Sequence, residues 1–411
     1  RQHSTDKMYL IMYDHNSTLD NFIFKKRKEI IDPRKRKEYV INTPRCRIEK
    51  TDWKNLFVVR IGRFRPNNFL NSLWYKKHIK PALKELKDHK ILNYKDTLYY
   101  TTYFWRYFDP KMFKTVLQIY DFAFPVYNQY SSQLAILNSI RKIQYWNALR
   151  PANKCEKILA ISEHTKKDIM KFLPGVQKNR VEVVTCGIER IMSYNKAKDY
   201  LLKEKNYKPL VSSKYLPADW KDKGYLIHLG GGVAMNKNPK GVIDGYLEFI
   251  KKIEKKHPNK IPYLLLAGKI FKQYEISAAM ELKDYIENLA LDQLIYYTGY
   301  YSNTEKVPLL VNSFAFIHLS LYEGFGLSLG EAMTCGVPVI AHKGTSYIEV
   351  VGDSGILVNG SNPKDVGNAI YRLWSSKRDR EKYGLAGLSR VQEFSWSKNA
   401  KALYNVFTKI V

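Results

Sequence analysis

Residues 319–347 read LSLYEGFGLSLGEAMTCGVPVIAHKGTSY, and this stretch decides the fold. An apolar strand-like run leads into a Gly324-Phe325-Gly326-Leu327 loop, after which a helix is predicted over 328–335. Glycines let backbone approach a ligand closely, and the first turn of the following helix presents free N–H groups and a positive dipole end. A diphosphate suits such a junction, so the stretch predicts a phosphate-binding edge of a parallel sheet.

Two glutamates bracket this loop. Glu323 precedes it, and Glu331 lies eight positions later, inside the predicted helix. This spacing places the Glu323 carboxylate beside the group that a bound diphosphate carries. It places the Glu331 carboxylate on the opposite side of the diphosphate. We therefore predict that Glu323 contacts a transferred group and Glu331 a ribose diol. Two surface glutamates beside an ordinary glycine loop are the alternative, because short glycine motifs are weakly diagnostic.

A second glycine cluster, Gly230-Gly231-Gly232, follows an apolar run at 225–229 and precedes Lys237 and a predicted helix over 240–256. A lysine at such a helix start suits the neutralisation of phosphate charge that develops on a leaving group. The segment matches neither the phosphate-cradling nor the dinucleotide glycine pattern. A solvated lysine at a helix start is therefore the alternative.

Strand-like and helical runs alternate outward from these motifs, which predicts an open parallel sheet in each half of the chain. Strands are predicted at 115–120, 157–161, 181–185, 225–229, 262–267, 294–298, 313–319 and 337–341, with a further helix at 363–375. The helix after 157–161 is predicted to open at Thr165, with Asp168 as its capping-box partner. Because ligands bind at the carboxyl ends of such strands, Asp121, which follows 115–120, is predicted to face the ligand.

The same pattern predicts the domain organisation of an α/β protein with two Rossmann-like domains that face a cleft. We expect an N-terminal domain over 1–190, an irregular charged connector over 191–223 and a C-terminal domain over 224–395. A final apolar-faced helix is predicted over 396–411.

Composition narrows the function classes. A chain of 411 residues with 45% hydrophobic and 26% charged residues excludes collagen, coiled coils and wholesale disorder. The absence of an apolar run of ~18 residues predicts no membrane span. The four cysteines are widely spaced, which indicates neither a zinc site nor a disulfide framework, so a cytoplasmic protein is expected.

The net charge of +29 favours anionic partners. Residues 1–190 hold 38 basic and 18 acidic residues, a net charge of +20, and the densest basic run spans 25–37. An anionic membrane surface or a phosphorylated substrate is the expected partner, with peripheral attachment to the inner face of the cell membrane; a solvated basic face is the alternative. No nucleic-acid-binding signature accompanies the charge, so no nucleic-acid partner is predicted.

At the family level, EGFGLSLGEAMTCGVPVIAHKGTSYIEVVGDSGILV resembles the donor-binding domain of retaining family-4 glycosyltransferases of the GT-B type. The segment YLIHLGGGVAMNKNPKGVIDGY resembles their phosphate-lysine segment, and FSWSKNAKALYNVF their C-terminal helix, which crosses back to the first domain. TVLQIYDFAFP and KILAISEHTKKDI through VEVVTCGIE fit the same family, whereas residues 1–70 match little of it.

The resemblance implies a retaining, metal-independent transfer of a sugar from a nucleoside-diphosphate sugar to a glycan or lipid-linked acceptor, in cell-surface polysaccharide synthesis. It assigns Glu323 and Lys237 to catalysis, with Asp121 beside them. It assigns the following residues to donor binding: Glu331, Gly324, Phe325, Gly326, Leu327, Ser328, Gly231, Asn238, Gly299 and Tyr300. Gly299 and Tyr300 would border the nucleobase.

Three positions depart from the family pattern. Tyr120 stands where many members carry a histidine before the aspartate, Gly231 where many carry arginine, and Asn236 where many carry a basic residue. These departures leave open a second reading from another class, a non-catalytic glycosyltransferase-like subunit that stabilises a partner enzyme. Intact Glu323, Glu331 and Lys237 favour the enzyme.

Overall fold

The chain divides into two compact units in the computed structural model, Arg1–Thr115 with Val411, and Val116–Ile410. The described residues are 8–12, 39–42, 46–50, 56–61, 84, 98–101, 114–123, 126, 142–143, 145–147, 149–203, 207–230, 235–273 and 277–410. The boundary expected from the sequence, at residue 190, stays a prediction, as does the interdomain role of 191–223.

The first unit contains a mixed sheet. Its strands are β1 (Met8–Met12), β2 (Tyr39–Asn42), β3 (Cys46–Lys50) and β4 (Leu56–Ile61), in the order β1-β4-β3-β2. β1 pairs with β4 in parallel, whereas β3 pairs antiparallel with both β2 and β4. A further strand of this unit is β5 (Leu98–Thr101). The basic run at 25–37 lies outside the described residues.

Parallel strands open the second unit. β6 (Lys114–Ile119), β7 (Lys157–Ala160) and β8 (Val181–Val183) are parallel neighbours, and α6 (Glu163–Phe172) connects β7 to β8. Five consecutive residues of β6 are buried, as expected for a parallel strand that is covered on both faces. The predicted strands at 115–120, 157–161 and 181–185 are thereby confirmed, and the last is two residues shorter than expected.

The predicted start of α6 is wrong. The helix begins at Glu163 rather than Thr165, and its N-cap is Ser162, whose side chain accepts a hydrogen bond from the Thr165 N–H at 3.0 Å. Serine is a strong N-cap residue, and here it satisfies one of the free amides of the first turn. Asp168 is therefore not a capping partner, and its carboxylate is available for a contact elsewhere.

The expectation of an irregular segment at 191–223 is also wrong. Three short helices occupy it, α7 (Tyr194–Lys203), α8 (Pro209–Ser213) and α9 (Trp220–Lys223). This segment packs through Ala197 of α7, Trp220 of α9 and Leu216 between α8 and α9, all of which are buried in the core of the second unit. Few apolar residues, widely spaced among lysines, anchor these helices, so their periodicity is faint in the sequence.

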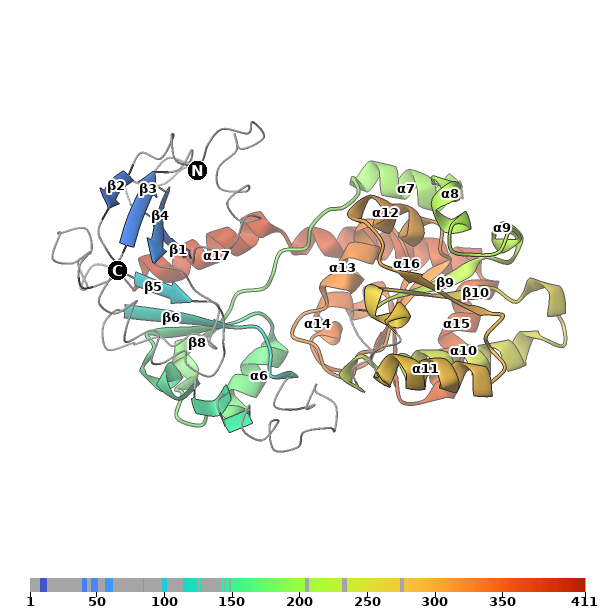
Figure 1. The fold of residues 1–411 in the computed structure, drawn as a ribbon, viewed down its shortest axis with the longest axis horizontal. Helices are drawn as coiled ribbons and strands as arrows, with labels where there is room; N and C mark the ends of the chain where they lie inside the picture. Colours follow the sequence, from blue (N-terminus) through green and yellow to red (C-terminus); the bar gives the residue numbers. More distant parts are fainter. Residues whose placement is uncertain are drawn as a thin grey trace. The chain divides into compact units, whose positions relative to one another are not determined.

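A six-stranded, all-parallel sheet is the largest feature of the second unit (Figure 1). Its strands are β9 (Tyr225–Leu229), β10 (Tyr263–Ala267), β11 (Ile295–Gly299), β12 (Ala315–His318), β13 (Val339–His342) and β14 (Ile356–Val358), in the order β11-β10-β9-β12-β13-β14. All residues of β9, β10 and β12 are buried. The predicted α/β class with parallel sheets is confirmed.

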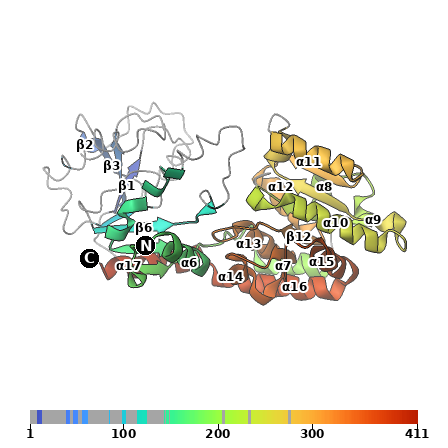
Figure 2. The ribbon, with the colours of Figure 1, turned by 90° about the horizontal axis from the view of Figure 1, so that it is seen from below.

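Helices cover both faces of this sheet (Figures 1 and 2). One core joins the strands to α10 (Pro239–Ile253), α11 (Ser277–Asn288) and α15 (Pro363–Ser375). The opposite core joins them to α12 (Asn303–Val311), α13 (Leu327–Thr334), α14 (Tyr347–Val351) and α16 (Lys377–Arg390). Apolar side chains that alternate along β9, with Leu226 on one face and Ile227 on the other, explain the two cores.

The last helix, α17 (Trp396–Thr408), lies against the segment that follows β8. The Asn399 Nδ2 donates to the Thr185 carbonyl at 2.7 Å, and the Trp396 ring fills the space that a side chain at position 187 would need. The predicted C-terminal helix therefore contacts the segment that directly follows β8. Within the described residues, no helix has the length and apolar character that a membrane crossing requires.

Adjacent strands bring the two sequence motifs to one edge of the sheet. β9 and β12 are parallel neighbours, so their carboxyl ends lie at the same edge. The chain leaves β9 towards the short 3-10 turn Met235–Lys237, and it leaves β12 into the loop that carries Glu323. Ligands of parallel sheets bind at this edge.

Candidate functional site

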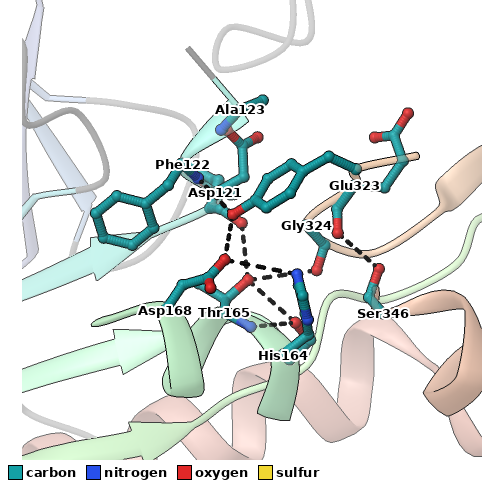
Figure 3. A network of polar contacts seen from close by, with 12 residues as sticks. Asp121, Phe122, Ala123, His164, Thr165, Asp168, Glu323, Gly324 and Ser346 are labelled. Atoms are coloured by element: carbon teal, nitrogen blue, oxygen red, sulfur yellow. Dashed lines mark hydrogen bonds and ion pairs between the residues drawn. The ribbon is translucent and has the colours of Figure 1, made fainter. Parts of the chain in front are cut away.

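An ion pair between Glu323 and Lys237 forms the centre of the candidate site. The Lys237 Nζ donates to the Glu323 Oε1, and both side chains are about one-fifth to one-quarter exposed, at 25% for the lysine and 20% for the glutamate. The His318 Nε2 lies 3.8 Å from the same carboxylate oxygen. The Glu323 carbonyl accepts a hydrogen bond from the Ser346 hydroxyl at 3.0 Å, which anchors the loop backbone (Figure 3).

Glu323 is a carboxylate at neutral pH. Burial alone would raise the pKa of its carboxyl, but the neighbouring His318 ring and the Lys237 ammonium outweigh burial and hold this pKa at about 2. An opposite charge within a few ångströms favours the ionised form of a group. The site therefore presents one anion and one cation, each able to exchange its partner for a charged or polar ligand group.

Buried polar atoms without a protein partner gather beside this ion pair. Among the residues that the structure describes, the Nε2 of His228, the Nδ1 of His318 and the Oδ1 of Asn236 are buried and find no hydrogen-bond partner. The two imidazole rings stack with centroids 5.1 Å apart, and the Asn236 Nδ2 lies 3.4 Å from the Tyr322 carbonyl. Because buried polar atoms in proteins are nearly always hydrogen-bonded, this group indicates a place that a polar ligand or water completes.

Asp121 joins the same electrostatic site from the end of β6. Burial raises the pKa of its carboxyl, the Glu323 carboxylate raises it further, and the Ala123 amide and Lys237 lower it. The Ala123 N–H donates to the Asp121 Oδ1 at 2.9 Å. In Figure 3 the Asp121 and Glu323 side chains lie on the same side of the hydrogen-bond network that joins α6 to the Glu323 loop. The structure thus brings together the three residues predicted to be catalytic, Glu323, Lys237 and Asp121.

The glycine loop requires its glycines. A Cβ at Gly324 would lie 2.2 Å from the Tyr120 carbonyl oxygen, so only glycine permits this approach of the loop to β6. Gly326 has a φ of +102°, a region that favours glycine, and it is the residue before α13. α13 begins at Leu327, one residue before the predicted start, and its free amides lie where the sequence predicted a diphosphate.

The other loop residues divide by exposure. Phe325 is buried, and its ring meets Phe394 edge-on with centroids 5.5 Å apart, so only its backbone is available to a donor. Leu327 is 47% exposed, and Ser328 is partly buried. The donor-binding role of this stretch stays a prediction, and the groups that the stretch offers for it are its backbone and the Ser328 hydroxyl.

Glu331 has a partner that sequence reasoning missed. The Lys306 Nζ, on α12, lies 3.1 Å from the Glu331 Oε1 and 3.0 Å from its Oε2, with both side chains about one-fifth exposed. The two residues are 25 positions apart, so no local pattern links them. Lys306 follows Glu305, which forms a capping box with Ser302. This capping box marks the start of a helix in the sequence but does not indicate that Lys306 contacts Glu331.

The remaining predicted donor-binding residues lie around the same edge or outside the described residues. Gly299 ends β11 with a φ of +65°, and Tyr300 beside it is 76% exposed. Gly231 lies outside the described residues. The Asn238 side chain caps α10 through the Gly241 N–H at 3.1 Å and donates to the Leu319 and Gly360 carbonyls, so its hydrogen bonds hold the fold.

No group of three or more His, Cys, Asp or Glu side chains among the described residues has the arrangement of a metal site. The expectation of metal-independent chemistry stays a prediction. The three cysteines whose side chains the structure describes, Cys155, Cys186 and Cys335, are buried and unpaired. Burial raises the pKa of the Cys186 thiol to about 11 and that of Cys335 to about 12, so neither is a thiolate at neutral pH.

A family model matches the part of the chain that carries both sequence motifs. Residues 222–390 match the family model described as Glycosyl transferases group 1. This range contains both motifs, from the β9 glycine segment with Lys237 to the Glu323 loop and Glu331. The part of the chain that carries both motifs is therefore similar to the glycosyl transferases of group 1.

A curated relative matches a little under half of the chain. O-antigen chain mannosyltransferase B from Escherichia coli is 30% identical over 187 residues, which cover 45% of this chain and 45% of that protein. The chain spans less than half the length of the first curated relatives that it matches.

Solved structures match nearly the whole chain. Sucrose-phosphate synthase from Thermosynechococcus elongatus superposes with a TM-score of 0.61 at 16% identity and covers 92% of this chain and 86% of that chain. An E. coli structure described as trehalose-6-phosphate bound with UDP-2-fluoro glucose has a TM-score of 0.63 at 12% identity, with 89% and 90% covered. These likenesses show a GT-B fold with Rossmann-like domains.

Proposed function

We propose that this chain is a glycosyltransferase that moves a sugar from a nucleoside-diphosphate sugar to a glycan or lipid-linked acceptor in cell-surface polysaccharide synthesis. The observation that carries the proposal is the Glu323–Lys237 pair at the carboxyl ends of β9 and β12, beside the start of α13. A cation and a helix N-terminus suit a diphosphate, and a carboxylate suits the hydroxyls of the sugar that the diphosphate carries.

In this proposal the three charged residues of the site bind different parts of the donor. Lys237 would leave Glu323 for the diphosphate and stabilise the charge that develops as the sugar departs, which is the kind of preorganised electrostatic effect that lowers barriers most. Glu323, released from the lysine, would accept hydrogen bonds from the sugar. Glu331, held by Lys306, would accept the ribose hydroxyls.

We propose mannose as the transferred sugar, with retention of its anomeric configuration and no metal. The relatives that support this choice are O-antigen chain mannosyltransferase B and a serotype-specific mannosyltransferase, both from E. coli. Retention and metal independence rest on the resemblance of the Glu323 loop to the family-4 pattern. The buried, unpartnered atoms of His228, His318 and Asn236 would complete their hydrogen bonds with donor or water.

A donor panel tests the proposal. Donor hydrolysis and transfer would be measured with GDP-mannose, UDP-glucose and UDP-N-acetylglucosamine, with chelator present, for the parent chain and for Glu323→Gln. We expect turnover of the mannose donor by the parent and the loss of most of it in Glu323→Gln, with nucleoside-diphosphate binding retained. The absence of turnover with every donor, together with binding to a partner glycosyltransferase, would instead establish the non-catalytic subunit.

We further propose that the chain binds anionic membrane surfaces peripherally through its basic residues, at net +20 for residues 1–190. Each Lys or Arg near an anionic leaflet contributes ~1 kcal/mol, and salt screens this attraction as the Debye length falls from ~10 Å at 0.1 M to ~3 Å at 1 M. Vesicle sedimentation should show binding to phosphatidylglycerol vesicles at low salt, release at high salt and no binding to neutral vesicles. A protein that stays in solution with anionic vesicles at low salt contradicts this proposal.

A further inference from the structure

The tyrosine just before Glu323 joins the glycine loop to the end of β6. The Tyr322 hydroxyl donates to the Asp168 Oδ2 on α6 and accepts the Phe122 N–H at 3.1 Å. Tyr322 is 6% exposed and Asp168 9%, so both lie away from bulk water. The hydroxyl thus connects three elements, β6, α6 and the loop between β12 and α13.

Two further contacts reinforce this junction. The Thr165 hydroxyl on α6 donates to the Tyr120 carbonyl at 3.1 Å and lies 3.5 Å from the Gly324 carbonyl. The Glu349 carboxylate on α14 accepts the N–H groups of Glu163 and His164 at 2.7 Å each, which caps the start of α6 from a distant part of the chain. These hydrogen bonds consequently restrict movement of α6 relative to the glycine loop and the end of β6.

The hydrogen bond between Phe122 and Tyr322 lies next to the two candidate catalytic carboxylates in the sequence. Phe122 directly follows Asp121, and Tyr322 directly precedes Glu323. The hydrogen bond between Phe122 and Tyr322 therefore lies one residue from each of the two carboxylates whose charges interact with Lys237. Burial and the Asp168 carboxylate raise the pKa of Tyr322 above its ordinary value, so at neutral pH the residue remains a hydroxyl that can donate.

We propose that Tyr322 and Asp168 are positioning residues, which fix the separation between the Asp121 and Glu323 carboxylates. The Asp168 carboxylate accepts the hydrogen bond of the tyrosine hydroxyl and so directs a lone pair of the hydroxyl oxygen at the Phe122 N–H. The bond at Phe122 then holds the end of β6 in register with the loop. This inference rests on the proposed function, because the two carboxylates matter through the sugar that would lie between them. In this proposal Tyr322 and Asp168 act through the two carboxylates and not by contact with the donor.

The test separates positioning from binding. In Tyr322→Phe we expect kcat for the donor to fall by about ten- to a hundredfold, the range that a misplacement of about 1 Å causes. The dissociation constant of the nucleoside diphosphate, measured by calorimetry, should stay within about twofold, because Lys237 and Glu331 keep their places. Asp168→Asn keeps an oxygen that accepts the tyrosine's hydrogen bond, so it should retain most of the parent's kcat, whereas Asp168→Ala should lose as much as Tyr322→Phe.

A matched control removes a similar bond elsewhere. The Tyr263 hydroxyl donates to the Asp219 Oδ1 at 2.6 Å on another part of the domain, so Tyr263→Phe should leave kcat unchanged. Parent-like kcat in Tyr322→Phe, or equal losses in Asp168→Asn and Asp168→Ala, would overturn the inference.

Hydrogen exchange provides a readout that does not need turnover. Amide exchange over residues 120–123 should rise in Tyr322→Phe and Asp168→Ala but not in Asp168→Asn or Tyr263→Phe. If Tyr322→Phe fails to fold, the comparison of kcat and amide exchange between Asp168→Asn and Asp168→Ala tests the positioning role. A parent without turnover contradicts the proposed function alone, whereas unchanged exchange over 120–123 contradicts the positioning role alone.

Discussion

Gly324 provides a sharp test of how the glycine loop meets β6. A Cβ added at this position would lie 2.2 Å from the Tyr120 carbonyl oxygen and 3.1 Å from both the Asp121 Cβ and the Ile161 Cδ1. Ordinary van der Waals contact begins near 3.4 Å, so in Gly324→Ala the two backbones must separate by about 1.2 Å, the difference between 3.4 and 2.2 Å. The closest atom belongs to backbone, which cannot rotate away as a flexible side chain would.

The magnitude follows from this overlap. Overpacking a well-filled interior costs ~1–3 kcal/mol, and a domain of 150–250 residues loses roughly 2–4 °C in Tm per kcal/mol. We therefore expect the Tm of Gly324→Ala to fall by several degrees. The separation also loosens the bond between the Thr165 hydroxyl and the Tyr120 carbonyl, which lies at the same place.

Thermal unfolding at matched concentration and scan rate is the assay, and Gly175→Ala is the matched control. A Cβ at Gly175 would lie 3.6 Å from the nearest atom of Asn153, an ordinary contact, and its backbone does not have positive φ. The control should keep or slightly raise the Tm, because alanine restricts the unfolded chain. Equal Tm values for the two variants would refute the close approach of the loop to β6.

Three further results are expected. Lys237→Ala should weaken nucleoside-diphosphate binding by roughly ten- to a hundredfold, as a lost charge-assisted bond of ~1.5–3 kcal/mol implies, and leave nucleoside binding unchanged in calorimetry. Lys306→Met should reduce the preference for a ribose over a 2′- or 3′-deoxyribose diphosphate, because the carboxylate of Glu331 loses the partner that orients it; an unchanged preference contradicts this role. Because the pKa of Glu323 is lowered to about 2, its ion pair contributes stability that is complete above the ordinary glutamate pKa of ~4.3 and is lost as the pH falls towards 2. The free energy of unfolding, measured with urea, should therefore decrease less between pH 5 and pH 2.5 in Glu323→Gln than in the parent.

The sheet and the loop motifs could be predicted from sequence because both are local. β10 spans Tyr263–Ala267 where 262–267 was predicted, and α13 spans Leu327–Thr334 where 328–335 was predicted. Fully buried parallel strands give continuous apolar runs, and a strand-to-glycine-to-helix junction marks its own boundaries. Glu323 and Lys237 meet because each follows one of two neighbouring strands.

Contacts between distant segments could not be predicted in the same way. Tyr322 and Asp168 are 154 positions apart, and Asp168 had a plausible local role as a capping residue that Ser162 in fact makes unnecessary. Lys306 resembles any exposed helical lysine until the fold places Glu331 beside it. The helices α7–α9 escaped notice because a few buried residues, such as Trp220, anchor a strongly charged segment.

The most direct test of the central claim is a crystal structure of the chain with a nucleoside diphosphate and manganese-free buffer. The account predicts that the β-phosphate lies within hydrogen-bond distance of the Lys237 Nζ and of the first amides of α13, that Glu323 is released from the lysine, and that Glu331 accepts the ribose hydroxyls. A diphosphate bound elsewhere, with the Glu323–Lys237 pair intact, would contradict it.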